Sequence, residues 1–156
     1  MDIKWGDFIA TVIQPLVVGA RVAFTITIPI PAGIEAAYGN GIVTDTLPAG
    51  FGLYTGAGTQ NSVKVGDTTL VENTDYTRTV TGQSVVYNIN NVKLTASSNL
   101  VITIDTTVTN KNTVAIPSTN TADLTFASVS GILGTGSVEY SLINPGPINY
   151  TGNTLI

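Results

Sequence analysis

The chain has 156 residues and a net charge of −4, and only 10% of its residues are charged, against roughly a quarter in an average soluble protein. It contains no cysteine and no histidine, which excludes disulfides, thiolate and imidazole metal sites, and catalysis by a thiol or an imidazole base. Its six Lys and Arg residues are scattered rather than gathered in a basic patch, and no apolar run reaches the roughly 18 residues of a membrane span. We therefore expect a protein that is not an enzyme, needs no cofactor, binds no nucleic acid and does not insert into a membrane.

Short strand-like segments follow one another along the chain, each rich in β-branched residues and bounded by turn-forming residues. Hairpin turns are expected at Gly66-Asp67 and at Thr81-Gly82-Gln83, and one helical turn within residues 33–38. Asp105 falls at an outward or edge position of the longest strand. The expected strands cover residues 8–18 (broken at Pro15), 22–28, 42–47, 61–65, 68–71, 76–80, 84–89, 100–108, 121–129 and 137–143.

This spacing of strands and turns predicts an all-β fold, an Ig-like Greek-key β-sandwich of about nine to ten strands. No linker divides the chain, so residues 1–156 are expected to form a single domain. Residues 1–18 are either the first strand of this domain or a strand donated to a neighbouring copy. Residues 144–156 are expected to form a turn-rich, extended C-terminal segment.

The surface that this sequence predicts is polar but uncharged. The chain holds 25 Thr and 13 Asn together with 16 Gly. Threonine favours strands, whereas asparagine and glycine favour turns. A surface of hydroxyls and amides suits a protein that packs against copies of itself, and it is equally compatible with a secreted β-sandwich that has no such packing.

One acid stands at the end of an apolar strand. Asp45 lies between Val43 and Leu47, and Pro48 and Gly50 then end the strand in a turn, because proline cannot donate to a sheet ladder and glycine tolerates a positive φ. Such an acid can cap a turn, or it can be buried as a reactive group.

Four segments resemble a known family. Residues 17–31, 43–50 (Val-Thr-Asp-Thr-Leu-Pro-Ala-Gly), 63–76 and 120–126 are similar to the fimbrial isopeptide-formation (D2-type) domain of Gram-positive pilins and to related Ig-like repeats of prokaryotic surface proteins. The resemblance implies an extracellular structural module, located on the cell surface or in a spore-surface appendage. In many members of the family, an amide bond between a lysine and an asparagine crosslinks the domain.

The resemblance also implies roles for individual residues. Asp45 takes the place of the acid and Asn120 that of the amide, while the first strand, where the lysine is expected, carries Arg21 and Ala23. Arginine stays protonated and cannot attack, so the one N-terminal lysine, Lys4, is the remaining candidate. The reaction requires a neutral amine and a protonated acid that polarises the amide carbonyl, and burial favours both states. In the alternative interpretation, Asp45 caps a turn, Asn120 begins a strand and Lys4 is solvated.

The chain departs from sortase-assembled pilins because it has no Leu-Pro-x-Thr-Gly sorting signal. Non-covalent assembly is therefore expected, and residues 8–18 are apolar and β-branched enough to complete a neighbour's sheet. The function that we predict is that of a structural subunit of an extracellular filament, pilus or surface appendage, with copies of itself as partners. The alternative is a monomeric cell-surface adhesin module that binds a host or carbohydrate ligand.

A calcium site is a weaker hypothesis. Asp67, Glu72 and Asp75 cluster around one expected hairpin, and carboxylate oxygens are the ligands that Ca²⁺ prefers. Their spacing matches no EF-hand, so a solvated turn is the competing explanation and no metal is assigned.

Overall fold

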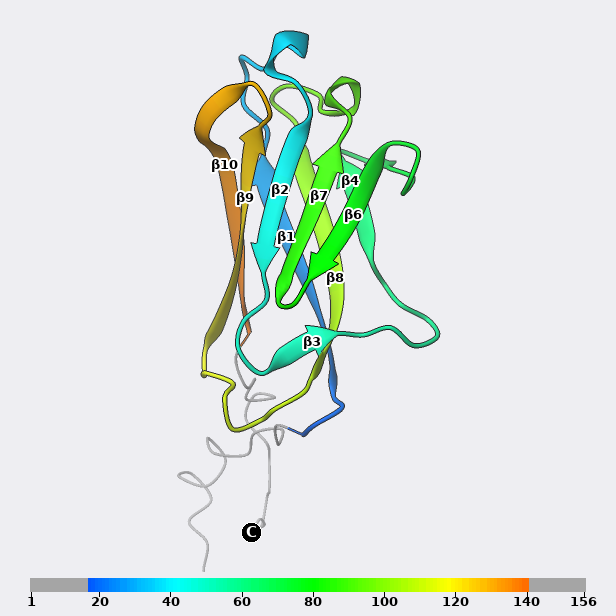
Figure 1. The fold of residues 1–156 in the computed structure, drawn as a ribbon, viewed down its shortest axis with the longest axis vertical. Helices are drawn as coiled ribbons and strands as arrows, with labels where there is room; N and C mark the ends of the chain where they lie inside the picture. The colour runs from blue at the N-terminus through cyan, green and yellow to red at the C-terminus, as the bar shows by residue number, and fades with distance from the viewer. Residues whose placement is uncertain (1–16, 141–156) are drawn as a thin grey trace, which may run out of the picture.

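The computed structural model describes residues 17–140, which form an antiparallel β-sandwich (Figure 1). Ten strands and two short 3₁₀ turns make up this part of the chain. The strands are β1 (Arg21–Pro29), β2 (Gly41–Thr46), β3 (Phe51–Leu53), β4 (Ser62–Val65), β5 (Thr68–Thr69), β6 (Tyr76–Thr81), β7 (Ser84–Ile89), β8 (Asn99–Val108), β9 (Ser118–Phe126) and β10 (Val129–Tyr140), and the turns are η1 (Ala36–Tyr38) and η2 (Asn91–Lys93).

The strands form two sheets of five. The first sheet has the order β1-β8-β4-β5, with β3 pairing onto the end of β8, and the second has the order β10-β9-β2-β7-β6. The predicted all-β, Ig-like sandwich is confirmed. No helix in residues 17–140 has the length and apolar character that crossing a membrane requires.

The core follows from the period-two pattern of the strands. In β1, Phe24, Ile26 and Ile28 are buried while the residues between them are exposed, because successive side chains of a strand point to opposite faces. The inward residues of both sheets form one large apolar cluster. A smaller cluster around Phe24, Phe51 and Val108 fills the end of the sandwich where β1 begins and β10 ends.

Aromatic rings hold this smaller cluster together. The Phe51 ring packs edge-on against Phe24, with 5.3 Å between centroids, and against Tyr140, with 5.4 Å between centroids. Edge-to-face pairs of this kind stabilise by about 0.5–1.5 kcal/mol beyond the area they bury. The cluster therefore ties the start of β1, the β3 segment and the end of β10 to one another.

One side of the sandwich is closed by the near contact of β1 with β10. A Cβ atom added at Gly134 would lie 2.8 Å from the carbonyl oxygen of Pro29, and one added at Gly136 would collide with the carbonyl oxygen of Thr27. The two backbones can approach this closely because these glycines have no side chain.

The strand boundaries at the C-terminal end differ from those predicted. The strand expected over 121–129 runs from Ser118 to Phe126, and β10 begins at Val129 rather than at residue 137. Two glycines in the part of β10 that was not predicted, Gly134 and Gly136, permit the approach to β1. The three-residue strand β3 was not predicted.

The predicted turns are confirmed. Gly66 and Gly82 have φ values of 57° and 60°, in the left-handed region that glycine adopts without strain, and they connect β4 to β5 and β6 to β7. The helical turn expected within 33–38 is η1. The strand expected over 8–18 lies outside the described residues apart from Val17 and Val18, as do the C-terminal segment 144–156 and the last part of the strand expected over 137–143.

Candidate functional site

Asp45 and Asn120 lie together on the inner face of the second sheet. Asp45 on β2 pairs with Ala122 on β9, and Asn120 precedes Ala122 by two residues, so the two side chains are diagonal neighbours on one face. Both residues have an exposed fraction of 0%. The structure thus brings together the acid and the amide that the family resemblance singled out.

Burial changes the chemistry of Asp45. Desolvation raises the pKa of Asp45 to about 7, and the nearby Asn120 amide opposes this rise only in part. Neither carboxyl oxygen of Asp45 and neither polar atom of the Asn120 side chain has a partner with full hydrogen-bond geometry. A carboxyl group in this state holds its proton near neutral pH and can donate a hydrogen bond to an amide carbonyl.

No lysine of residues 17–140 contacts this pair. Lys64 alternates with the buried Val63 and Val65, which places its side chain on the outer face of β4. Lys93 forms an ion pair with Asp75, with 3.5 Å between Nζ and Oδ1. Lys111 lies in an exposed loop. Lys4 lies outside the described residues.

Phe24 is the inward residue of β1 that lies level with Asn120. Val138 pairs with Asn120 across the β9–β10 ladder and packs against the cluster that contains Phe24. Two residues earlier, Gly136 lies against Ile26, which fixes the same alignment of β10 with β1. The first strand therefore presents a phenyl ring to the buried pair. The alternation of residues 22–28 already placed Phe24 on the inner face, so this could have been found from the sequence.

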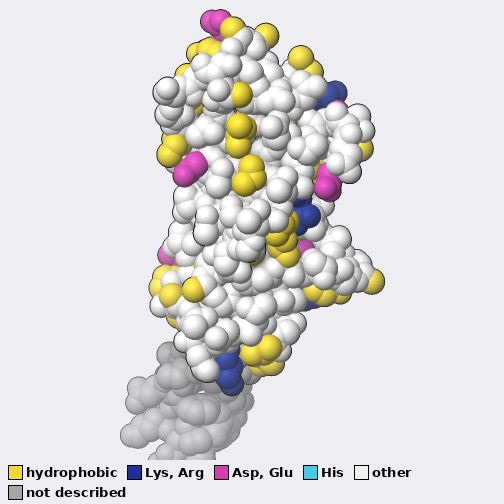
Figure 2. Space-filling model, viewed as in Figure 1, with side chains coloured by type: hydrophobic (Ala, Val, Ile, Leu, Met, Phe, Trp, Pro, Cys, Tyr) yellow, Lys and Arg dark blue, Asp and Glu magenta, His cyan; other side chains and the backbone are white. Residues whose placement is uncertain are grey.

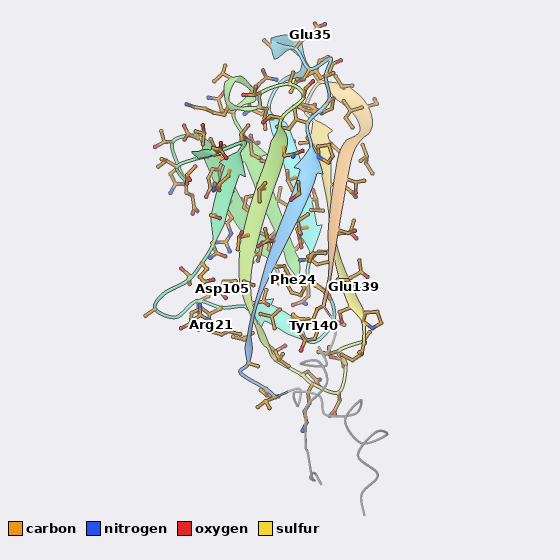
Figure 3. The ribbon with its side chains drawn as sticks, turned by 180° about the vertical axis from the view of Figure 1, so that it is seen from behind. Arg21, Phe24, Glu35, Asp105, Glu139 and Tyr140 are labelled. Carbon is orange, nitrogen blue, oxygen red and sulfur yellow. The ribbon has the colours of Figure 1, made fainter. Side chains whose placement is uncertain are left out.

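Arg21 and Asp105 form a separate cluster on the outside of the first sheet (Figure 3). The Arg21 guanidinium donates to the Asp105 carboxylate and to the Gly58 carbonyl, and it lies 3.9 Å from the centre of the Tyr54 ring. The backbone N–H of Gln60 donates to the same carboxylate, with 2.9 Å between nitrogen and oxygen. These contacts fasten the loop over residues 54–61 to the sheet.

The structure confirms the predicted outward position of Asp105, but the residue is not exposed. Its side chain points away from the core, but the loop over residues 54–61 covers it and leaves Asp105 only 1% exposed. Arg21 and Ala23 also point outward, so neither occupies the inner position of a crosslinking lysine.

Two further buried polar groups lie on the second sheet, on the two strands that follow β2 in its strand order. Tyr87 on β7 and Arg78 on β6 face one another in the β6–β7 ladder, and the Tyr87 hydroxyl and the Arg78 Nε are buried without hydrogen-bond partners. Burial raises the pKa of Tyr87 to about 12. Together with Asp45 and Asn120, these residues account for all the buried unpartnered side-chain atoms in residues 17–140. No motif or pattern in the sequence pointed to Arg78 or Tyr87.

The three carboxylates considered for calcium are not brought together as a metal site. Asp75 accepts from the Val71 amide at 2.7 Å and pairs with Lys93, so its two oxygens serve the local turn. Residues 17–140 contain no group of three or more acidic side chains placed to hold a metal ion, and Asp67 and Glu72 therefore form no such group with Asp75.

Comparisons with known proteins identify the fold. No family model matches the chain, and no curated protein sequence matches it. The N-terminal domain of the Streptococcus gordonii adhesin Sgo0707 matches with a TM-score of 0.63 and 24% identity over 83% of this chain and 30% of that one. The full-length major pilin SpaD from Corynebacterium diphtheriae matches with a TM-score of 0.59 and 18% identity over 80% of this chain and 31% of that one.

A third structure extends the same result. BcpA, the major pilin subunit of Bacillus cereus, matches with a TM-score of 0.58 and 18% identity over 79% of this chain and 35% of that one. The chain therefore spans about a third of the length of these three proteins. The family resemblance is confirmed at the level of the fold: this chain has the Ig-like β-sandwich found in domains of bacterial pilins and adhesins.

Proposed function

We propose that this chain is a structural subunit of an extracellular filament, pilus or surface appendage, and that it does not act as an enzyme on other molecules. The observation that carries the proposal is the buried Asp45–Asn120 pair, set within a fold that major pilins share. The similar structures are pilins and an adhesin, so the proposal concerns the cell surface, and they give no support to a spore-surface location.

The surface supports packing between copies. Figure 2 shows a face with few charged side chains, which are scattered among hydrophobic groups, other side chains and backbone. Where hydroxyls meet, as at Thr25 and Thr103 with 3.1 Å between their oxygens, they pair with one another. Such a surface can approach another copy without the desolvation cost of many charges.

Assembly is proposed to use β-strand contacts, with residues 8–18 as the donated strand. Within the described residues, β6 ends the second sheet, and its outer side carries only an isolated bridge between Tyr76 and Glu72. The rest of β6 offers unpaired backbone groups that an added strand would satisfy. Contacts of this type join unlike surfaces and generate an open filament rather than a closed ring.

An internal bond between Lys4 and Asn120, assisted by Asp45, is proposed as a stabilising crosslink. The neutral Asp45 carboxyl would polarise the Asn120 carbonyl, the neutral Lys4 amine would attack it, and ammonia would leave. The intact mass tests this bond: the crosslinked chain is lighter by about 17 Da, the mass of one ammonia. An unchanged mass in the folded full chain would remove Lys4 from the proposal.

Negative-stain microscopy and size-exclusion chromatography of the purified full chain test the main proposal. We expect filaments or a ladder of oligomers that grows with protein concentration. A strictly monomeric chain at every concentration would favour the second candidate, a monomeric cell-surface adhesin module for a host or carbohydrate ligand. That candidate is supported by the similarity to an adhesin domain and by an amide-rich groove of about 260 Å³ that includes Asn40, Asn73, Asn88 and Asn90.

A further inference from the structure

The two sides of the sandwich differ. On one side, β1 and β10 approach backbone to backbone, and no groove remains between them at Gly134 and Gly136. On the other side, β6 ends the second sheet, while the first sheet presents the chain from β3 to β4 (Figure 1). A groove of about 530 Å³ lies between these two elements. This volume falls within the range of small-ligand sites.

The groove has one basic group at its wall. Arg78 lines it from β6, and no carboxylate within residues 17–140 forms an ion pair with Arg78. The Arg78 Nε and the hydroxyl of Tyr87, directly opposite in the ladder, are buried and have no partner with full hydrogen-bond geometry, although Arg78 lies close enough to Tyr87 to oppose the rise of its pKa. A buried donor without a well-placed acceptor is unfavourable, so Arg78 is suited to a ligand that brings an acceptor. A carboxylate matches a guanidinium in both charge and geometry.

The other residues that line the groove suit a polyhydroxylated ligand. Thr55 and Thr59 contribute hydroxyls, Asn61 contributes an amide and Glu72 contributes a carboxylate that can accept hydrogen bonds from hydroxyls. Tyr54 adds an aromatic ring, on which the apolar face of a sugar can pack. Leu53 and Val80 are the aliphatic residues of the lining.

We propose that this groove is a binding site for a carboxylated saccharide, such as a uronic acid unit of a polysaccharide. Arg78 binds the sugar carboxylate, the side chains of Thr55, Thr59, Asn61 and Glu72 bind ring hydroxyls, and Tyr54 packs against the ring. The site lies on the open side of the sandwich and does not involve Asp45 or Asn120, so it goes beyond the proposed structural role.

The test is a nuclear magnetic resonance titration of the full chain with three probes: D-glucuronate, D-glucose and acetate. We expect glucuronate to shift the amide resonances of residues 54–61 and the Nε–H of Arg78, with an affinity at least about tenfold higher than that of either other probe. We expect this difference because glucose lacks the carboxylate and acetate lacks the ring hydroxyls. The absence of shifts with glucuronate would overturn the proposal. Equal binding of acetate would show a site for bare carboxylates and would also overturn it. A capped tri-glutamate peptide, titrated separately as a fourth probe, would overturn it by binding more tightly than glucuronate.

Matched variants locate the site. Arg78→Gln is expected to reduce glucuronate affinity at least about tenfold, whereas Lys111→Gln, which removes one positive charge from an exposed loop, leaves it unchanged. If Arg78→Gln does not fold, Thr59→Ala provides the second test, because Thr59 is exposed and its loss is expected to weaken glucuronate more than acetate. Unchanged glucuronate binding in both folded variants would contradict the assignment. The titrations are carried out at a concentration at which the chain is monomeric, so a failure of this proposal and a failure of filament assembly are separate results.

Discussion

Asp45 and Asn120 meet as diagonal neighbours on strands β2 and β9, with no exposed surface on either side chain. Two polar groups in an apolar core are costly unless their polar atoms find partners, and here they do so incompletely. The arrangement therefore has consequences for stability and for reactivity that can be measured separately.

The first prediction concerns pH. Burial raises the pKa of Asp45 from its ordinary value of 3.8 to about 7, so between these values the folded chain holds a proton that the unfolded chain has lost. The contribution to stability is complete below pH 3.8 and is lost as the pH rises through about 7. Because one pKa unit corresponds to about 1.4 kcal/mol, the free energy of unfolding is expected to fall by at most about 4 kcal/mol over this range through Asp45.

Asp45→Asn isolates this contribution. Denaturant unfolding at pH 5 and pH 8 should show a smaller loss of stability in the variant than in the parent chain. Asp67→Asn, at an exposed turn, is the control and should keep the pH dependence of the parent. Identical pH profiles for Asp45→Asn and the parent would show that Asp45 is not protonated in the folded chain.

The second prediction concerns the residue that lies level with Asn120. Phe24→Lys would place an amine on the inner face of β1, beside a protonated acid and an amide, and such proximity supplies most of the acceleration that amide formation needs. We expect a fraction of the variant to lose about 17 Da, the mass of ammonia, by intact-mass measurement.

Two controls accompany this variant. Thr25→Lys places the same amine on the outer face of β1 and should leave the mass unchanged, and Phe24→Lys combined with Asp45→Ala should also leave it unchanged. A folded Phe24→Lys chain of full mass would refute the idea that Asp45 and Asn120 are competent for the reaction.

The third prediction concerns the closed side of the sandwich. Gly136→Ala is expected to destabilise the chain by about 1–3 kcal/mol, because the added Cβ collides with the Thr27 carbonyl oxygen and forces β10 away from β1. Gly33→Ala is the matched control, since a Cβ at Gly33 meets no atom within 4 Å. Equal urea midpoints for the two variants would argue against close packing of β10 on β1.

The fourth prediction concerns the cluster on the outer face of the first sheet. Arg21→Gln removes the ion pair to Asp105 and the contact with Tyr54, so the loop over residues 54–61 should open more often. Limited proteolysis is expected to cleave this loop faster in the variant, while Lys111→Gln should behave as the parent. Unaltered cleavage in Arg21→Gln would mean that the Gln60 and Asn61 contacts to Asp105 hold the loop by themselves.

The sequence predicted the fold well because local rules determine most of it. The alternation of Thr with Ile in residues 22–28 and 100–108, together with glycine turns at 66 and 82, specifies strands and hairpins without reference to the rest of the chain. The first part of β10, residues 129–136, was not predicted, because the role of Gly134 and Gly136 depends on a long-range approach to β1. The burial of Asp105 was not predicted either, because it depends on the loop over residues 54–61, which folds over this side chain.

The candidate site was partly predictable. The placement of Asp45 and Asn120 followed from a family resemblance, and the orientation of Phe24 was available from the β1 alternation. The positions of Arg78 and Tyr87 depend on which strand forms the open edge of the sheet, and this topology cannot be read from periodicity.

Sedimentation velocity of the purified full chain over a range of concentrations tests the central claim most directly. A structural subunit that joins its neighbours through β-strand contacts should sediment as a series of species whose average size increases with concentration, with filaments visible by electron microscopy at the upper end. A single monomeric species at every concentration would contradict the account.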